Sequence, residues 1–117
     1  MKYMLMFIND DVRWQGMPEA DRQRAYANIG SWFREQTEAG RYVSGEELQP
    51  QATATTIRFR GDKAVVTDGP FMEAKETIGG FAIVEVADLD QAIELAKSWP
   101  GLGDVEVRPV VDHSQDM

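Results

Sequence analysis

The segment Val66–Phe81 reads VTDGPFMEAKETIGGF and joins two apolar runs that are typical of β-strands. It contains an Asp-Gly-Pro turn at 68–70, charged side chains at 73, 75 and 76, and a Gly-Gly pair at 79–80. Connections between strands often carry functional residues, because a rigid scaffold on either side positions them. We therefore expect the rest of the chain to be arranged around this segment.

The 117 residues suit one domain, which we expect to span residues 1–112, with a frayed tail at 113–117. A chain of this size builds a modest core, so association with another chain is a natural supplement. The absence of cysteine excludes disulfides and thiolate chemistry. The apolar opening, 1–8, is too short to span a membrane and has no cleavage site, so we expect a cytoplasmic protein.

The net charge of −8 argues against a nucleic-acid partner, which would require a basic surface. Arg58, Arg60 and Lys63 form a local basic patch around a turn, and we interpret them as a solvated face. A lone His113 in the tail leaves no set of metal ligands, so we expect no metal site. No phosphate loop or dinucleotide motif is present, and no cofactor is expected.

Hydrophobic patterning predicts the order of elements. Residues 2–8 form an apolar strand, 9–17 a polar loop, and Pro18 begins a long amphipathic helix that ends at Gly40. Gly30 inside this helix indicates a close backbone contact. Its apolar stripe comprises Ala25, Ile29, Trp32, Phe33 and Gln36.

The second half of the chain predicts further strands and one helix. Residues 42–48 form a short strand, and 53–60 with 63–67 form a hairpin. A strand at 81–86 leads to a helix that Asp88 and Gln91 cap, and 104–110 forms the last strand. Ignoring the hairpin, the order is βαββαβ, which favours a ferredoxin-like α+β sandwich with an inserted hairpin.

Apolar residues on both faces of the predicted sheet indicate that a second subunit covers the face without helices. The motifs Thr-Asp-Gly-Pro-Phe at 67–71, Gly-Gly-Phe at 79–81 and Val-Glu-Val-Arg-Pro at 105–109 support this. They resemble the DGPF branch of the YCII-related family of small bacterial proteins. The resemblance implies a dimeric α+β barrel, formed by two such sheets closing face to face.

Asp68 is the first candidate catalytic residue, either as a general base or as a ligand for a polar group. The alternative is a local role, because aspartate often accepts backbone N–H groups at turns. Gly69 is interpreted as a backbone device, and Phe71 as a core or pocket-wall ring. Both are included in the predicted ligand-binding set.

Glu73, Lys75 and Glu76 form the second catalytic group. A lysine between two carboxylates can hold one ionised while burial raises the pKa of the other, which is how acid–base pairs arise. A solvated charged loop is the alternative. Gly79 and Gly80 would let the backbone approach a ligand or a partner strand, or would simply reverse the chain. Of the pair at 46–47, Glu46 is included among the ligand-binding residues.

Two functions of different class remain open. The first is a small-molecule isomerase or lyase using carboxylate acid–base chemistry in a barrel cleft. The second is a non-catalytic metabolite-binding or regulatory module, because relatives of this kind occur beside extracytoplasmic-function sigma factors. In other YCII-related proteins the resemblance implies a His–Asp active site, which cannot apply here because the body of this chain contains no histidine.

Overall fold

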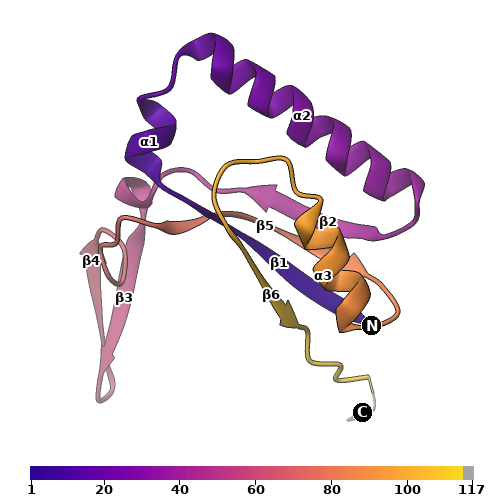
Figure 1. Ribbon diagram of the computed structural model, residues 1–117. Coiled ribbons are helices and arrows are strands. Elements are labelled where there is room, and N and C mark those ends of the chain that lie inside the picture. The colour runs from indigo at the N-terminus through magenta and orange to yellow at the C-terminus, as the bar shows by residue number, and fades with distance from the viewer. Residues whose placement is uncertain (115–117) are drawn as a thin grey trace.

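Four antiparallel strands form the main sheet, in the order β2–β5–β1–β6. The computed structural model describes residues 1–114; it is shown in Figure 1. The strands of this sheet are β1 (Lys2–Asn9), β2 (Tyr42–Glu47), β5 (Thr77–Glu85) and β6 (Val105–Pro109). This strand order and the βαββαβ sequence of elements confirm the predicted ferredoxin-like α+β fold. Closure of a barrel by a second chain remains a prediction.

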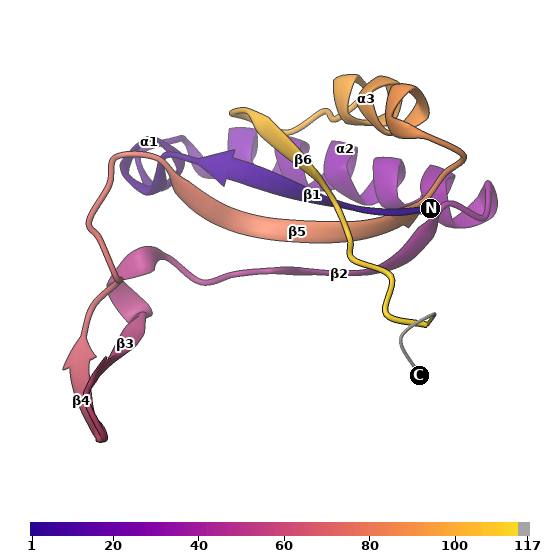
Figure 2. The same ribbon diagram turned by 90° about the horizontal axis from the view of Figure 1, so that it is seen from below.

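Both long helices, α2 (Glu19–Glu38) and α3 (Leu89–Lys97), cover the same face of the sheet (Figures 1 and 2). Alternation along β1 directs Tyr3, Leu5 and Phe7 towards these helices, where all three are buried. Leu5 and Val84 are completely buried at the centre. The rest of the core consists of Trp32, Ala82, Val86, Ala92 and Leu95. This cluster lies between the sheet and the helices; Met6, which alternation directs to the other face, is also buried.

The predicted helix caps are confirmed. Pro18 immediately precedes α2, and Gly40 follows it with a φ of +74°, a conformation that favours glycine. Asp88 accepts a hydrogen bond from the Gln91 backbone N–H at 3.0 Å, and the Gln91 side chain accepts one from the Ala87 N–H at 2.9 Å. The stripe on α2 is also confirmed, with Trp32 and Gln36 buried.

Two local predictions were wrong. The predicted loop at 9–17 contains a short helix, α1 (Asp11–Gln15), which begins because the Asp10 side chain accepts the Arg13 backbone N–H at 3.1 Å. Five residues are too few to show a helical period. No atom lies within 4 Å of a Cβ placed on Gly30, so the close contact expected there is absent.

Strand β5 is longer than predicted and includes Gly79 and Gly80, which were expected to precede it. A Cβ on Gly80 would lie 2.9 Å from the Glu46 carbonyl oxygen, and one on Gly45 would lie 2.6 Å from the Phe81 carbonyl oxygen. The two strands approach so closely that these positions exclude a side chain. Of the three interpretations of the glycine pair, the approach to a partner strand is observed at Gly80, and a role in ligand binding stays a prediction.

The inserted hairpin, β3 (Thr55–Arg60) and β4 (Lys63–Asp68), is also confirmed and forms a separate two-stranded sheet. A short 3₁₀ turn, η1 (Gln51–Thr53), connects it to the body. Figures 1 and 2 show the hairpin projecting from the side of the main sheet opposite the helices. Most of the tail predicted for 113–117 lies outside the described residues.

We predict opposite effects of alanine at two glycines. Gly45→Ala should lower the free energy of unfolding by at least about 1 kcal/mol, because its methyl group would overlap backbone atoms of β5. Gly30→Ala should raise it by up to about 1 kcal/mol, since the helix gains propensity and the site is open. Urea unfolding measures both, and equal effects of the two variants would contradict the close strand approach.

Candidate functional site

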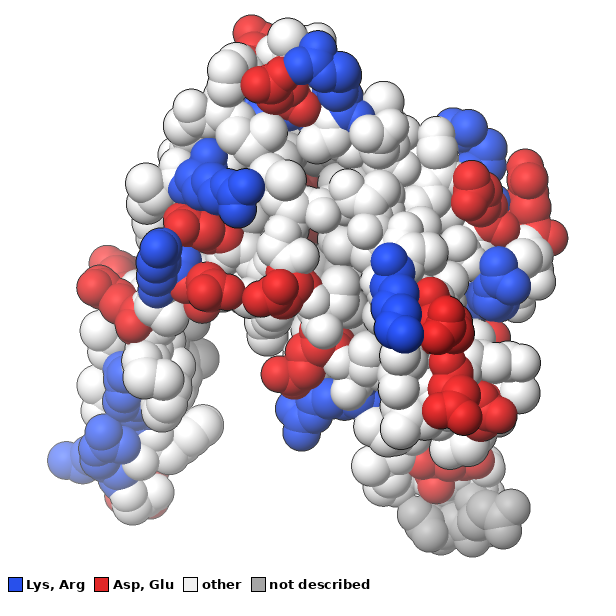
Figure 3. Space-filling view, in the orientation of Figure 1, with Lys and Arg blue, Asp and Glu red and all other residues white. Residues whose placement is uncertain are grey.

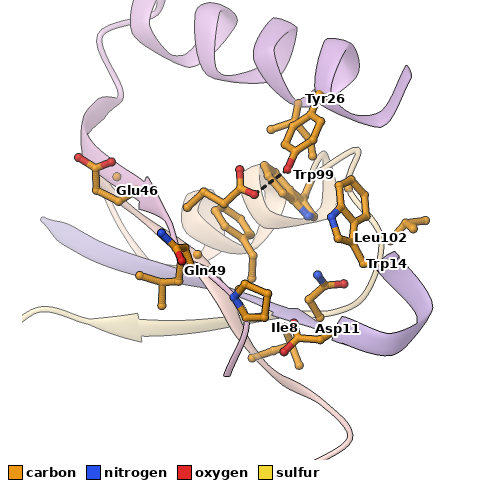
Figure 4. Close-up of a pocket in the computed structure, with 18 of the residues that line it drawn as sticks. Ile8, Asp11, Trp14, Tyr26, Glu46, Gln49, Trp99 and Leu102 are labelled. Carbon is orange, nitrogen blue, oxygen red and sulfur yellow. Dashed lines mark hydrogen bonds between the residues drawn. The ribbon is translucent and has the colours of Figure 1, made fainter. Parts of the chain in front are cut away.

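A cavity of about 660 Å³ lies between α2 and the helix-facing side of the main sheet. Its walls come from the end of β1, from α1, from the first half of α2, from β2 and its following loop, and from the loop after α3. Figure 4 shows Trp14, Tyr26, Trp99 and Leu102 around the same hollow. Segments distant in sequence therefore meet here.

Six aromatic residues line the cavity: Phe7, Trp14, Tyr26, Phe33, Tyr42 and Trp99. Tyr26, Ile29 and Phe33 share one face of α2 because they are spaced by three and four residues. Trp14 meets Tyr26 edge to face at 5.2 Å, and Phe7 stacks on Trp99 with ring centroids 3.8 Å apart. These contacts hold the rings rigidly, so the apolar wall is preformed.

Tyr26 and Glu47 form the principal polar contact of the cavity. The Tyr26 hydroxyl donates a hydrogen bond to Glu47 Oε1 at 2.7 Å (Figure 4). This bond raises the pKa of Tyr26, because ionisation of the phenol would lose the bond. Partial burial raises the pKa as well, and so does the charge of Glu47, because ionisation would place two negative charges side by side. Arg22 opposes the shift. The pair thus holds a proton between a phenol and a carboxylate at the cavity wall.

Trp99 provides an unused donor. Its Nε1 is buried and has no hydrogen-bond partner within residues 1–114. A buried donor without an acceptor costs about 1–3 kcal/mol. The atom lies beneath Gly101, where a Cβ would come within 2.5 Å of it, so the donor is closed off by the chain itself.

The Asp11 carboxylate has a structural role. Its Oδ2 accepts the Gln51 backbone N–H at 3.0 Å, which fixes η1 to α1. Among residues 1–114, no group of three or more His, Cys, Asp or Glu side chains is arranged to hold a metal ion.

The structure separates the predicted site residues into two groups. Gly79, Gly80 and Glu46 line the cavity. Strand alternation directs the Glu46 carboxylate to the opposite face of the sheet from Gly45, and Figure 4 shows it at the margin. Its neighbour Glu47 is the residue whose carboxylate meets Tyr26.

The remaining predicted residues lie at the base of the hairpin, away from the cavity. Asp68 is exposed and pairs with Thr55. The Gly69 N–H donates to the Ala54 carbonyl at 2.8 Å.

The rest of the signature segment is also at the surface. Phe71 is exposed, with the Arg58 guanidinium 5.1 Å from its ring centroid. Glu73 and Lys75 border a shallow depression beside Gln51, and Glu76 is exposed outside it. A single chain therefore does not bring these charged groups and the cavity together.

Sequence reasoning missed Tyr26 and Trp99 as site residues. Tyr26 continues the stripe of Ile29 and Phe33 at helical spacing, a signal that was present. Trp99 lies two residues beyond the end of α3 and Trp14 lies in α1; both line the cavity, and Trp14 packs on Tyr26 of α2.

These features define a ferredoxin-like α+β protein with an aromatic cavity between its long helix and its sheet. The model of the YCII-related domain matches residues 1–114, and the chain belongs to that family. It is 31% identical over 114 residues to "Uncharacterized protein R00369" of Rhizobium meliloti (strain 1021), which covers 94% of this chain and 92% of the relative. No helix within residues 1–114 is long and apolar enough to cross a membrane.

We predict that the hydrogen bond between Tyr26 and Glu47 is detectable in solution. Because it favours the neutral phenol, its stabilisation is present below about pH 10 and is lost as the pH rises through the raised pKa of Tyr26. Glu47→Gln should therefore shift the ultraviolet titration of tyrosine to lower pH. In a Tyr26→Phe background the same change should have no effect; a shift there would place the titrating group elsewhere.

Proposed function

We propose that this protein binds a small, largely apolar organic molecule in the cavity and transfers a proton on it. The observation that carries the proposal is the Tyr26–Glu47 hydrogen bond, which joins an exposed phenol and an exposed carboxylate at the wall of a cavity lined by six aromatic residues. A volume of about 660 Å³ falls within the range of roughly 300–1,000 Å³ that is typical of ligand sites. Besides the pair, the polar residues Asn9, Asp11, Gln15, Glu46 and Gln49 line the cavity and offer a ligand further hydrogen bonds.

The chemistry that suits these groups is the isomerisation of a carbonyl compound. Glu47, as a carboxylate, would remove a proton from a carbon next to the carbonyl group, and the electron pair of the C–H bond would move towards the carbonyl oxygen. Returning the proton to a second carbon completes an isomerisation without an oxidant or reductant. Tyr26 would orient Glu47 throughout.

We predict that ligands stabilise the wild-type protein but not cavity variants. Thermal unfolding across a library of carbonyl-containing metabolites should yield hits, since a ligand at one hundred times its Kd adds about 2.7 kcal/mol. Tyr26→Phe and Ile29→Trp should lose these hits. Asp68→Asn and Lys75→Met, which change the signature segment outside the cavity, serve as matched controls. Hits lost only in these controls would place the site at the signature segment instead.

Proton transfer needs a separate measurement. With a ligand in D₂O, the wild-type protein should exchange the acidic C–H of the ligand for deuterium, as followed by NMR. Glu47→Gln should slow this exchange by about 10²–10⁴-fold, which is the usual contribution of a general base. Binding without exchange in the wild type would reject catalysis and favour the non-catalytic metabolite-binding module, for which a sigma-factor-linked protein is the proposed partner.

We also propose a homodimer. The face of the main sheet that carries no helix holds Met4, Met6, Phe81 and Ile83, with Glu46, Glu106 and Arg108 beside them; Met6 is buried and the other three apolar residues are half-buried. A second copy is the simplest cover for such a face. This dimer would also place a neighbouring chain beside the signature segment.

A further inference from the structure

We call the hairpin of β3 and β4, residues 55–68, the arm; one of its faces is apolar towards the tip and carries Thr55 and Asp68 at its base. Ile57 pairs with Val66 and Phe59 with Ala64, so these four side chains share that face. Phe59 is 73% exposed and Val66 66%. Every residue of β4 is exposed. An isolated two-stranded hairpin is at best marginally stable in water, so this face requires cover.

The area of the molecule indicates how large that cover is. The chain exposes 8374 Å², whereas a compact monomer of 13.2 kDa exposes about 6,400 Å². Its radius of gyration is 16.6 Å, against about 13 Å for a compact chain of this length. The surplus of roughly 2,000 Å² exceeds the ~800 Å² that each partner buries in a standard protein interface. A protein fits this surface, and a small molecule does not.

Position points to a second copy of this chain. The arm projects on the same side of the main sheet as the face without helices (Figures 1 and 2). A two-fold axis can therefore place each arm against the sheet of the other chain, which closes the assembly at two. The arm carries three cations, at 58, 60 and 63 (Figure 3), and the strand pairing places all three on the face opposite the apolar one, where they stay in solvent when the apolar face is covered.

We propose that the arm packs its apolar face on the body of a second copy of this chain, so that the two copies exchange arms. The segment 68–76, which leaves the arm, then lies at the interface between the chains. This inference is narrower than a dimer held by the sheets alone, and it does not depend on what the cavity binds.

Adjacent valines on β4 provide a matched pair of variants. Val66 belongs to the apolar face and Val65 faces the opposite way, paired with Arg58. Val66→Asp should weaken dimerisation by at least roughly tenfold, because it places a charge in an apolar contact. Val65→Asp should leave the dissociation constant nearly unchanged. Sedimentation velocity over a range of concentrations measures both. A monomeric wild type, or equal effects of the two variants, would overturn the proposal.

A second measurement does not rely on a destabilised variant. The chain lacks cysteine, so Lys63→Cys at the tip of the arm accepts a single nitroxide label. Refolded together with ¹⁵N-labelled wild-type protein, the labelled chain should broaden amide signals of the sheet around Met4 and Ile83. A label at Lys97→Cys, on α3 across the sheet, should not. If the arm label leaves those amides sharp, the arm does not reach the second chain, even where a dimer forms.

Discussion

The structure depends on the division of side chains along β1, the strand that pairs with both β5 and β6. Tyr3, Leu5 and Phe7 point to the helices and form the centre of the only core within residues 1–114. Met4 and Met6 point to the other face, which no helix covers. A shift of one residue would exchange these sets, so the hydrophobic pattern strongly specifies the register. The one-sided core and the open face are two results of one constraint.

The cavity follows from the size of the side chains on the covered face. Phe7 and Trp99 stack in parallel, and Trp32 meets both rings edge to face. Trp32 also donates to Ser98 Oγ at 2.8 Å, so its orientation is fixed. Towards the first turns of α2, glycines at 45, 79 and 80 supply no side chains to fill the space, and a hollow remains.

Strand and helix order could be predicted from the sequence because the apolar residues alternate or recur at helical spacing over long segments. The capping pair at Asp88 and Gln91 is likewise local, and it was predicted correctly. The cavity could not be predicted, because it joins Trp14, Tyr26, Glu47 and Trp99 from four separate elements. No local sequence pattern predicts that these four residues lie close together. The charged residues at 73–76 are a stronger local signal than the scattered residues of the cavity. For this reason the sequence predicted a site next to the arm.

Gln51 connects these two regions of the molecule. Its backbone N–H donates to Asp11, in the helix that carries Trp14, and its side-chain Nε2 donates to the Ala74 carbonyl at 2.6 Å. Ala74 lies between Glu73 and Lys75, so the signature segment is linked through one residue to a wall of the cavity. A force that moves the base of the arm therefore acts on α1 as well. The charged signature side chains themselves do not line the cavity; only the backbone of Ala74 takes part in this link.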